Sequence, residues 1–455
     1  MSNDSNKMKI LFISLGCDKN LVDSEEMLGL LNREHFEFTD DESEADVIVI
    51  NTCCFVNDAK EESVNTILQM AEYRKSGSCK ALIVTGCLAQ RYKTEISDEI
   101  PEVDAILGTS SYDKIVDAVK STICGEKYEK FNPLDELIVE ESERVVTTGG
   151  HYAYIKIAEG CNKCCTYCII PKIRGRYRSV PEEDILKTAE KLVENGAKEL
   201  ILVAQETTLY GVDLYGRKML PDLLKKICKI PGLIWVRILY CYPEEITDEL
   251  IEVMKNEPKV CHYIDMPIQH ASDKILKAMG RRTNRVELTE RILKIRKEIP
   301  DIVLRTTLIS GFPGETEEDH EEMLDFVDEM EFERLGVFAY SPEEDTAAAE
   351  MPDQIDEDIK IKRRNEIMEL QQEIAFENAE NMIGRDLLVM IEGKVVDENA
   401  YVGRTYMDCP NVDGNIFITT DEELITGDFV KVKVTGAAEY LSLIHISEPT
   451  RPRLI

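Results

Sequence analysis

The sequence predicts an α/β protein of three domains: an amino-terminal parallel sheet, a central open (β/α)6 barrel and a small carboxyl-terminal β-barrel. Apolar strands that alternate with amphipathic helices predict the first two domains, because this order is typical of parallel sheets covered by helices. A final run of short strands separated by turn residues predicts the small barrel. The length of 455 residues agrees with two to four domains, since single cores rarely exceed about 250–300 residues.

The first part of the chain, residues 8–124, alternates apolar strands with amphipathic segments. Strands are expected at Lys9–Leu15, Ala45–Thr52, Ala81–Thr85 and Asp104–Leu107, and helices at Leu21–Asn32, Asp58–Arg74 and Ser111–Ser121. This order predicts a flavodoxin-like sheet wrapped by helices. Such sheets bind ligands at the carboxyl ends of their strands.

Three of these strands lead directly to a cysteine, namely Cys17, Cys53 and Cys87. The carboxyl ends of neighbouring parallel strands meet at one edge of the sheet. One such cysteine would mean little, because free cysteines often simply pack in cores. Three at equivalent positions predict a three-cysteine metal site, in which Cys54 could replace Cys53.

Residues 125–150 are acidic and contain Asn132-Pro133 and Gly149-Gly150, so they are expected to form a linker. The strand and helix alternation then resumes over residues 151–380. Strands are expected at Tyr154–Ala158, Glu199–Ala204, Trp235–Cys241, Tyr263–Pro267, Val303–Ser310 and Leu335–Tyr340. Helices are expected at Glu182–Glu194, Pro221–Cys228, Thr247–Lys255, Val286–Glu298, Glu317–Met330 and 355–383. Six βα units predict an open (β/α)6 barrel, with functional residues at the carboxyl ends of its strands.

The loop after the first barrel strand contains a CxxxCxxC pattern formed by Cys161, Cys165 and Cys168. It offers three thiolates from one loop, which suits an iron–sulfur cluster and leaves one iron open to a small molecule. Structural zinc is the alternative, although a closed zinc site needs a fourth ligand. Cys164 is interpreted as an additional thiol, although it also forms a CxxxC pair with Cys168.

This loop resembles that of the radical S-adenosylmethionine (AdoMet or SAM) enzymes, in which three cysteines hold a [4Fe–4S] cluster that binds AdoMet. The resemblance implies that Cys161, Cys165 and Cys168 are catalytic. It also implies that Tyr167, which immediately precedes the last cysteine, lies against the adenine.

Other residues near the same rim of the barrel are expected to bind the cofactor. Gln205 and Glu206 follow the second barrel strand and are expected to contact the AdoMet amino group or the substrate. Gly311 follows the fifth strand, where a glycine allows the backbone to approach a ligand closely. Arg174 lies in a basic segment after the cysteine loop and is expected to bind an anionic substrate or the AdoMet carboxylate.

Three motifs of the first domain make the chain similar to the methylthiotransferase family over roughly residues 8–440: Gly16–Glu25, Asn51–Cys53 and Gly86–Arg91. The resemblance implies that Cys17, Cys53 and Cys87 carry an auxiliary cluster, so that the cofactors are two [4Fe–4S] clusters and AdoMet. It further implies that one AdoMet methylates a sulfur on the auxiliary cluster and that a second yields the radical that activates the substrate carbon. The electron would come from a low-potential donor such as flavodoxin or ferredoxin.

Residues 381–441 combine short strands with turn signals and predict the small β-barrel. They resemble the TRAM domain that ends these enzymes, although residues 384–441 hold eleven acidic and five basic residues, a net charge of −6. The tail, residues 442–455, departs from the family's ending and resembles a translated vector or adapter sequence. It is therefore expected to be non-native or disordered.

Two segments, Ala204–Gly211 and Tyr340–Thr346, resemble the RimO branch of the family, which modifies an aspartate β-carbon in small-subunit ribosomal protein twelve. Asp345 stands where glycine is usual. The net charge of −34 favours a basic ribosomal protein over nucleic acid as substrate. The alternatives are a transfer-RNA adenosine methylthiotransferase and a non-catalytic iron–sulfur redox or scaffold protein.

The protein is also expected to be cytoplasmic and to make no membrane contact. No apolar run approaches the ~20 residues of a membrane span, and the polar start at Met1–Lys7 is not a signal peptide. The 14 cysteines are accordingly expected to be metal ligands and buried thiols rather than disulfides.

Overall fold

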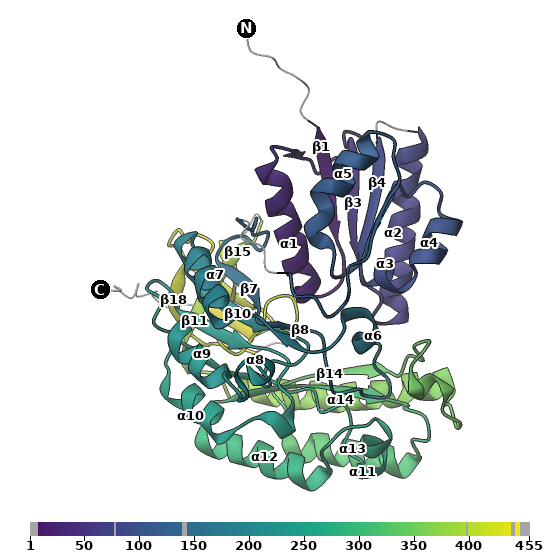
Figure 1. Ribbon diagram of the computed structural model, residues 1–455. Helices are drawn as coiled ribbons and strands as arrows, with labels where there is room; N and C mark the ends of the chain where they lie inside the picture. The colour runs from purple at the N-terminus through teal and green to yellow at the C-terminus, as the bar shows by residue number, and fades with distance from the viewer. Residues whose placement is uncertain (1–7, 77–78, 139–142, 397–398, 438–441, 446–455) are drawn as a thin grey trace.

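The computed structural model describes residues 8–76, 79–138, 143–396, 399–437 and 442–445. Two six-stranded sheets and one five-stranded sheet organise these residues. In Figure 1 the amino-terminal domain, coloured purple to blue, lies above the barrel, and the yellow carboxyl-terminal domain lies behind β7, β10 and β11. Parallel sheets followed by a curled carboxyl-terminal sheet confirm the predicted fold class. Among the helices of the described residues, none combines the length and apolar composition needed to cross a membrane.

The amino-terminal sheet has the strand order β2-β1-β3-β4-β5-β6, and all of its pairs are parallel. Its strands are β1 (Lys9–Ser14), β2 (Glu37–Phe38), β3 (Val47–Thr52), β4 (Ala81–Gly86), β5 (Ala105–Leu107) and β6 (Tyr128–Lys130). Its helices are α1 (Asp18–Arg33), α2 (Asn57–Ser76), α3 (Cys87–Arg91), α4 (Lys93–Glu99), η1 (Tyr112–Lys114) and α5 (Ile115–Ile123). Helices α1 and α5 pack on one face of the sheet, and α2, α3 and α4 pack on the other.

The first domain extends beyond its expected end at residue 124. Strand β6 pairs in register with β5, so part of the predicted linker belongs to the sheet. Strand β6 consists of Tyr, Glu and Lys, and β2 of Glu and Phe. Edge strands this short and polar lack the apolar runs by which strands are recognised from sequence.

The central sheet is open and has the strand order β14-β13-β12-β11-β10-β7, again wholly parallel. Its strands are β7 (Tyr152–Lys156), β10 (Glu199–Val203), β11 (Trp235–Ile238), β12 (Val260–Asp265), β13 (Val303–Ser310) and β14 (Arg334–Ala339). The main helices are α7 (Glu182–Glu194), α9 (Leu220–Ile227), α10 (Asp248–Asn256), α12 (Arg285–Glu298), α13 (Glu317–Met330) and α14 (Glu357–Glu380). These six parallel strands and the helices that follow them form the open (β/α)6 barrel that the sequence predicts.

Shorter elements decorate the carboxyl ends of these strands. They are β8 (Ala158–Glu159), α6 (Ile170–Arg174), β9 (Arg178–Ser179), α8 (Val212–Tyr215), η2 (Pro243–Glu245), α11 (Asp273–Ala278) and η3 (Ala347–Glu350). Strands β8 and β9 form an antiparallel pair that flanks the cysteine loop. A capping box formed by Thr316 and Asp319 begins α13.

Alternate residues of the barrel strands face two different cores, as the two-residue period of a strand requires. Ala153 and Ile155 of β7 point toward the helical layer and join the core formed with α7 and α9. Tyr152 and Tyr154 of the same strand point to the opposite face. There they pack with Cys409 and other residues of the carboxyl-terminal domain.

Residues 404–413 of the carboxyl-terminal domain fill this second face, and we call them the plug. Arg404 donates to Glu199 Oε2 at 2.6 Å, and Arg237 donates to Glu199 Oε1 at 2.8 Å. Tyr263 Oη donates to Asp413 Oδ2 at 2.7 Å. The plug therefore joins the barrel to the carboxyl-terminal domain through buried charges.

The carboxyl-terminal sheet has the order β18-β15-β16-β17-β19 and curls so that β19 approaches β18. Its strands are β15 (Asp386–Lys394), β16 (Ala400–Arg404), β17 (Ile416–Thr419), β18 (Phe429–Lys433) and β19 (Ser442–His445). The expectation of a wholly disordered tail is wrong for residues 442–445, which pair in parallel with β17. The exposed backbone of an edge strand such as β17 can order a following segment by pairing with it. Residues 446–455 lie outside the described residues.

Candidate active site

The three cysteines of the CxxxCxxC pattern lie in one loop between β8 and α6. Cys161 and Cys165 are buried and Cys168 is half-buried, whereas Cys164 is exposed. Burial raises the pKa of the Cys161 thiol to about 11 and that of Cys168 to about 12. A metal bound here would have to displace the thiol protons, because the thiolate is the form that binds metals.

Hydrogen bonds and one glycine fix the loop. The Cys161 N–H donates to Gly175 O at 3.1 Å, and the Cys168 N–H donates to Cys165 O at 3.0 Å. Gly160 has a φ of +78°, and a Cβ at this position would lie 2.2 Å from Arg176 O. Only glycine combines this backbone conformation with such a close approach.

Gln205 and Glu206 lie where the sequence predicts, directly after β10. Gln205 Nε2 donates to Glu159 Oε1 at 2.7 Å, and its own Oε1 is buried without a hydrogen-bond partner. Glu206 is fully buried; one of its carboxylate oxygens accepts from Thr208 N at 3.0 Å, and the other has no hydrogen-bond partner. Burial raises the pKa of Glu206 to about 7.

Two functional candidates beside the loop are absent from the sequence prediction. Arg281 is buried with its guanidinium 4.2 Å from the centre of the Tyr242 ring. Tyr242 Oη lies 3.8 Å from Cys165 Sγ. Arg281 lies more than a hundred residues from the loop in sequence, and neither residue belongs to a local motif. Only their positions beyond the carboxyl ends of predicted barrel strands could have suggested them, since Tyr242 follows β11 and Arg281 follows α11.

Unpartnered polar atoms gather at the rim formed by the carboxyl ends of the barrel strands. Among the described residues, buried rim atoms without a hydrogen-bond partner belong to Gln205, Glu206, Glu244, Arg281, Ser310 and Tyr340. Buried polar atoms normally find partners, because leaving one unpaired costs about 1–3 kcal/mol. AdoMet carries an ammonium and a carboxylate, and the rim offers both free acceptors and free donors. The residues present therefore fit this cofactor.

The remaining predicted cofactor residues differ in their surroundings. Tyr167 is half-buried against the apolar cluster that includes Phe312 and Tyr340, beside the loop. The N–H of Gly311 already donates to Glu315 Oε2 at 2.8 Å, and a Cβ on Gly311 would lie 2.2 Å from Lys360 Cγ. The close approach that this glycine allows is thus to helix α14.

Arg174 is the last residue of α6, the helix that follows the cysteine loop. It is buried and pairs with Asp23 and Glu159, so its charges are already matched. Its Nη2 lies 3.4 Å from Cys87 Sγ. The structure thus gives Arg174 partners that the expected contact with an AdoMet carboxylate would have to displace.

Cys17, Cys53 and Cys87 follow β1, β3 and β4, which are neighbours in the sheet. A Cβ on Gly16, which has a φ of +93°, would lie 2.9 Å from Cys53 Sγ, so only glycine allows this approach. Burial raises the pKa of Cys87, and the neighbouring thiols of Cys54, Cys53 and Cys17 raise it further. The topology therefore brings the three predicted cysteines to one sheet edge.

Cys53 and Cys54 have different environments. The Cys53 backbone is fixed by Ser63, which accepts from its N–H at 3.1 Å and donates to its carbonyl at 2.8 Å. Besides burial, the charge of Cys17 raises the pKa of Cys53. Cys54 is completely buried in the core under α2, and burial raises its pKa to about 12, with Arg91 acting in the opposite direction.

Within the described parts of the chain, no three His, Cys, Asp or Glu side chains converge as ligands do around one metal ion. Each cysteine of a [4Fe–4S] cluster binds an iron of its own, so its cysteine ligands stand further apart than those of a single ion. The lack of such a convergent group among the described residues therefore does not argue against a cluster site.

Three family models match successive parts of the chain. Residues 9–108 match "Uncharacterized protein family UPF0004", residues 155–327 match the radical SAM superfamily, and residues 383–441 match the TRAM domain. Among solved structures, the chain is similar to TsrM, a radical S-adenosylmethionine methyltransferase from Kitasatospora setae. The TM-score is 0.51 at 14% identity, covering 74% of this chain and 77% of that chain. The cobalamin-dependent radical enzyme OxsB gives a TM-score of 0.52 at 14% identity, covering 81% of this chain and 56% of that one. These similarities concern the fold alone.

Relatives of known name cover nearly the whole chain. It is 66% identical to the ribosomal protein uS12 methylthiotransferase RimO of Lachnoclostridium phytofermentans, covering 95% of this chain and 98% of that protein. Proteins of the same name from Clostridium botulinum strain Hall and Clostridioides difficile are 51% and 49% identical, each covering 95% of this chain and 97% of the relative.

An open (β/α)6 sheet with a cysteine loop after its first strand, preceded by the three-cysteine domain and followed by TRAM, defines a radical SAM methylthiotransferase. More specifically, the chain belongs to the RimO family of ribosomal protein uS12 methylthiotransferases. Membership implies that it uses AdoMet and a [4Fe–4S] cluster.

Proposed function

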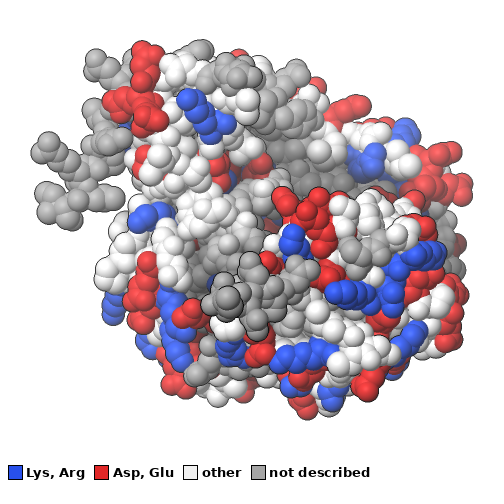
Figure 2. All heavy atoms as spheres, turned by 90° about the horizontal axis from the view of Figure 1, so that it is seen from above, with Lys and Arg blue, Asp and Glu red and all other residues white. Residues whose placement is uncertain are grey.

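We propose that the protein adds a methylthio group to the β-carbon of an aspartate in ribosomal protein uS12. The 66% identity to a uS12 methylthiotransferase over 95% of the chain carries this proposal. The net charge of −34 supports it, since a basic ribosomal protein is attracted to an acidic enzyme. On the face shown in Figure 2, the basic side chains of the described residues are interrupted by acidic ones, which does not favour contact with a phosphate backbone.

The proposal includes two [4Fe–4S] clusters. Their proposed ligands are Cys161, Cys165 and Cys168 for the barrel cluster and Cys17, Cys53 and Cys87 for the auxiliary cluster. When bound, AdoMet and the clusters supply the radical and the methylthio group. One set of three cysteines follows three parallel strands of the amino-terminal domain, and the other lies in a single loop of the barrel domain. Two such separate sets support the two-cluster assignment.

The protein's own residues would bind and orient AdoMet at the rim. The Gln205 and Glu206 oxygens that have no hydrogen-bond partner are acceptors suited to its ammonium group, and Lys163 Nζ lies 4.0 Å from the Glu206 oxygen. The free Nε and Nη1 of Arg281 are donors suited to its carboxylate. Tyr167 offers an aromatic surface for the adenine.

We also propose partners beyond the substrate. A low-potential donor such as flavodoxin or ferredoxin would supply the electron, because AdoMet cleavage requires one. The protein would act on uS12 in the cytoplasm. Its negative charge favours association with a basic protein of the ribosome rather than with ribosomal RNA.

Mass spectrometry can test the substrate. Anaerobically reconstituted protein is incubated with AdoMet, a reductant and either uS12 or transfer RNA, with the Cys161→Ala variant as control. A methylthio mass gain on an aspartate of uS12 is expected with the parent alone. A modified adenosine would instead support the transfer-RNA alternative, and the absence of deoxyadenosine with either substrate would support the scaffold alternative.

A further inference from the structure

One buried arginine connects the two cysteine sites. Arg174 ends α6, and only 3% of its surface is exposed. Its Nη1 donates to Asp23 Oδ2 at 2.7 Å and to Glu159 Oε2 at 3.3 Å. Its Nη2 donates to Asn20 and lies 3.4 Å from Cys87 Sγ. The guanidinium thus contacts both the amino-terminal domain and the β8 strand that precedes Cys161.

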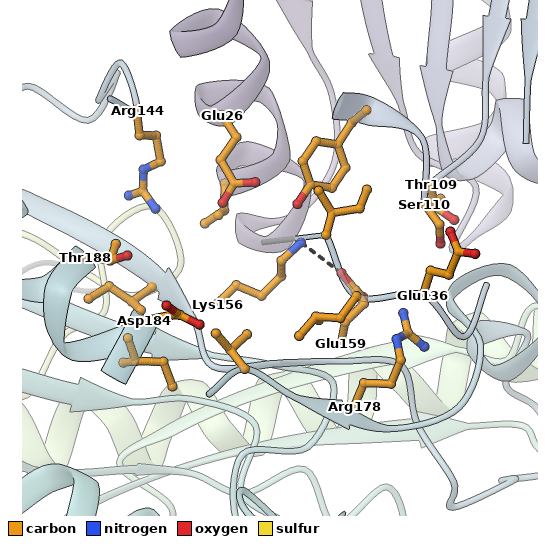
Figure 3. A pocket seen from close by; sticks show the side chains of 17 residues that line it. Glu26, Thr109, Ser110, Glu136, Arg144, Lys156, Glu159, Arg178, Asp184 and Thr188 are labelled. Carbon is orange, nitrogen blue, oxygen red and sulfur yellow. Dashed lines mark hydrogen bonds and ion pairs between the residues drawn. The ribbon is translucent and has the colours of Figure 1, made fainter. Parts of the chain in front are cut away.

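Ion pairing alone does not explain this arrangement. Lys156 pairs with the same two carboxylates, those of Asp23 and Glu159. Figure 3 shows the Lys156 and Glu159 contact, 2.9 Å long, at the wall of a cavity between α1 and the barrel. Two cations therefore face two anions, while the Nη2 limb of Arg174 is directed away from both carboxylates and toward the Asn20 side chain and the Cys87 thiol.

The planar guanidinium holds both of its limbs in a fixed relation, which a lysine ammonium cannot do. Because Nη1 is anchored on Asp23 and Glu159, the position of Nη2 beside Cys87 is set by the contact between the two domains. Glu159 is itself held by Gln205 Nε2 at 2.7 Å. The network therefore runs from the amino-terminal cysteines to the rim of the barrel.

We propose that Arg174 is a positioning residue for the auxiliary cluster, donating a charged hydrogen bond from Nη2 to the Cys87 thiolate and so raising the cluster's reduction potential. This inference rests on the proposed function, because it takes Cys17, Cys53 and Cys87 as cluster ligands. Reduction adds negative charge to a cluster, and a cationic donor on a ligand sulfur stabilises that charge.

The test uses the full chain carrying Cys161→Ala, Cys165→Ala and Cys168→Ala, so that only the auxiliary cluster forms. Iron is counted first, and the midpoint potential is then measured by a redox titration followed by electron paramagnetic resonance. Arg174→Lys keeps the positive charge that Asp23 and Glu159 require, but it loses the limb on Cys87. The matched control is Arg178→Lys. Arg178 is a nearby arginine whose Nη1 donates to the backbone carbonyls of Arg174 and Arg176 rather than to a cysteine thiol.

Arg174→Lys should leave the iron content unchanged and lower the ratio of reduced to oxidised cluster about tenfold at a fixed potential, a shift of about 59 mV to lower potential. Arg178→Lys should leave the potential unchanged. Equal midpoint potentials in the triple-cysteine variant with and without Arg174→Lys would overturn the inference while leaving the proposed function intact. If the triple-cysteine background holds no iron, both the auxiliary ligand assignment and the inference fail.

A second variant covers poor folding of Arg174→Lys. Arg174→Gln combined with Asp23→Asn removes one charge of each sign and therefore leaves the buried network balanced. The same shift to lower potential is expected, because Nη2 is the only contact with Cys87 that this variant removes. An unshifted potential in a variant that retains its iron would overturn the inference.

Discussion

Two buried polar regions meet the barrel sheet, and they differ in how completely their groups are paired. Where the plug meets the barrel, Glu199 of β10 accepts from Arg237 of β11 and from Arg404 of the plug, and Arg334 of β14 pairs with Asp408 at 2.5 Å. At the rim, one carboxylate oxygen of Glu206 has no hydrogen-bond partner. The plug is thus complete in itself, whereas the rim requires a ligand to supply the missing partners.

The two glutamates show what this difference does to an ionisable group. Both are fully buried. Burial opposes ionisation of Glu199, but Arg404 and Arg237 hold its pKa below the usual range. Burial raises the pKa of Glu206 to about 7, because its charged partners are too few. Burial of charge alone therefore does not mark a functional site, and missing partners do.

The largest expected effect separates the two cysteine sets. Cys161→Ala should reduce deoxyadenosine formation below detection, because the barrel loop is the set beside the free donors and acceptors of the rim. Cys53→Ala should retain AdoMet cleavage but lose methylthio transfer. Chromatography of deoxyadenosine and mass spectrometry of uS12 measure the two activities; full cleavage by Cys161→Ala would refute this division of roles.

Cys54→Ala is the matched control for Cys53→Ala. Since Cys54 is fully buried in the core under α2, its replacement should leave the iron content and methylthio transfer near those of the parent. Loss of transfer in Cys54→Ala, with full activity in Cys53→Ala, would show that Cys54 is the ligand.

A substitution at the contact between the plug and the barrel should lower the free energy of unfolding rather than alter the chemistry. Glu199→Gln leaves Arg237 and Arg404 buried without their carboxylate, which costs about 3–5 kcal/mol. Denaturant unfolding followed by the fluorescence of Trp235, the only tryptophan, reports this directly, because its ring lies 4.7 Å from that of Phe429 across the interface. Iron content should remain that of the parent.

The same variant has a defined pH dependence. The folded-state pKa of Glu199 is below its ordinary value of 4.5, so its stabilising effect is complete above about pH 4.5 and declines as the pH falls below it. The difference in unfolding free energy between parent and Glu199→Gln should therefore be smaller at pH 4 than at pH 7. Glu298→Gln, at an exposed pair with Lys255, is the control and should show no measurable change. A constant difference across this range would contradict the assignment.

A smaller effect is expected at the rim, where a substitution should change AdoMet affinity rather than the free energy of unfolding. Glu206→Gln should weaken AdoMet binding by about 10- to 100-fold, since a hydrogen bond to a charged group contributes about 1.5–3 kcal/mol. It should not lower stability, because the variant removes a poorly paired buried carboxylate. Equilibrium dialysis measures the affinity. Glu245→Gln, whose carboxylate already pairs with Lys163 and Lys218, should have a weaker effect; equal losses in both variants would count against a special role for Glu206.

The sequence predicts much of this fold because its strands and helices carry their own periodicity. Strands β3 and β4 are continuous buried runs, and the predicted limits of α7 and α13 agree with the structure. The short polar strands β2 and β6 carry no such pattern. Strand β19 lies in the tail expected to be non-native or disordered because it departs from the family's ending. Its pairing depends on a free strand edge elsewhere in the chain, which no local pattern shows.

The candidate site also combines features that the sequence predicts with contacts that it does not predict. Cysteine spacing and strand ends are local features, so both cysteine sets can be read from sequence. The contacts of Arg174 with Cys87 and of Tyr242 with Cys165 join residues separated by 87 and 77 positions. Such contacts follow from how the domains pack, and no local pattern encodes them.

The central claim is that two separate cysteine sets hold clusters, and iron counting in two complementary variants tests it most directly. Anaerobically reconstituted parent should hold about eight iron atoms per chain, as two [4Fe–4S] clusters require. Replacing Cys161, Cys165 and Cys168 by alanine should leave about four, and so should replacing Cys17, Cys53 and Cys87. Undiminished iron in either triple variant, or zinc as the main metal, would contradict the account.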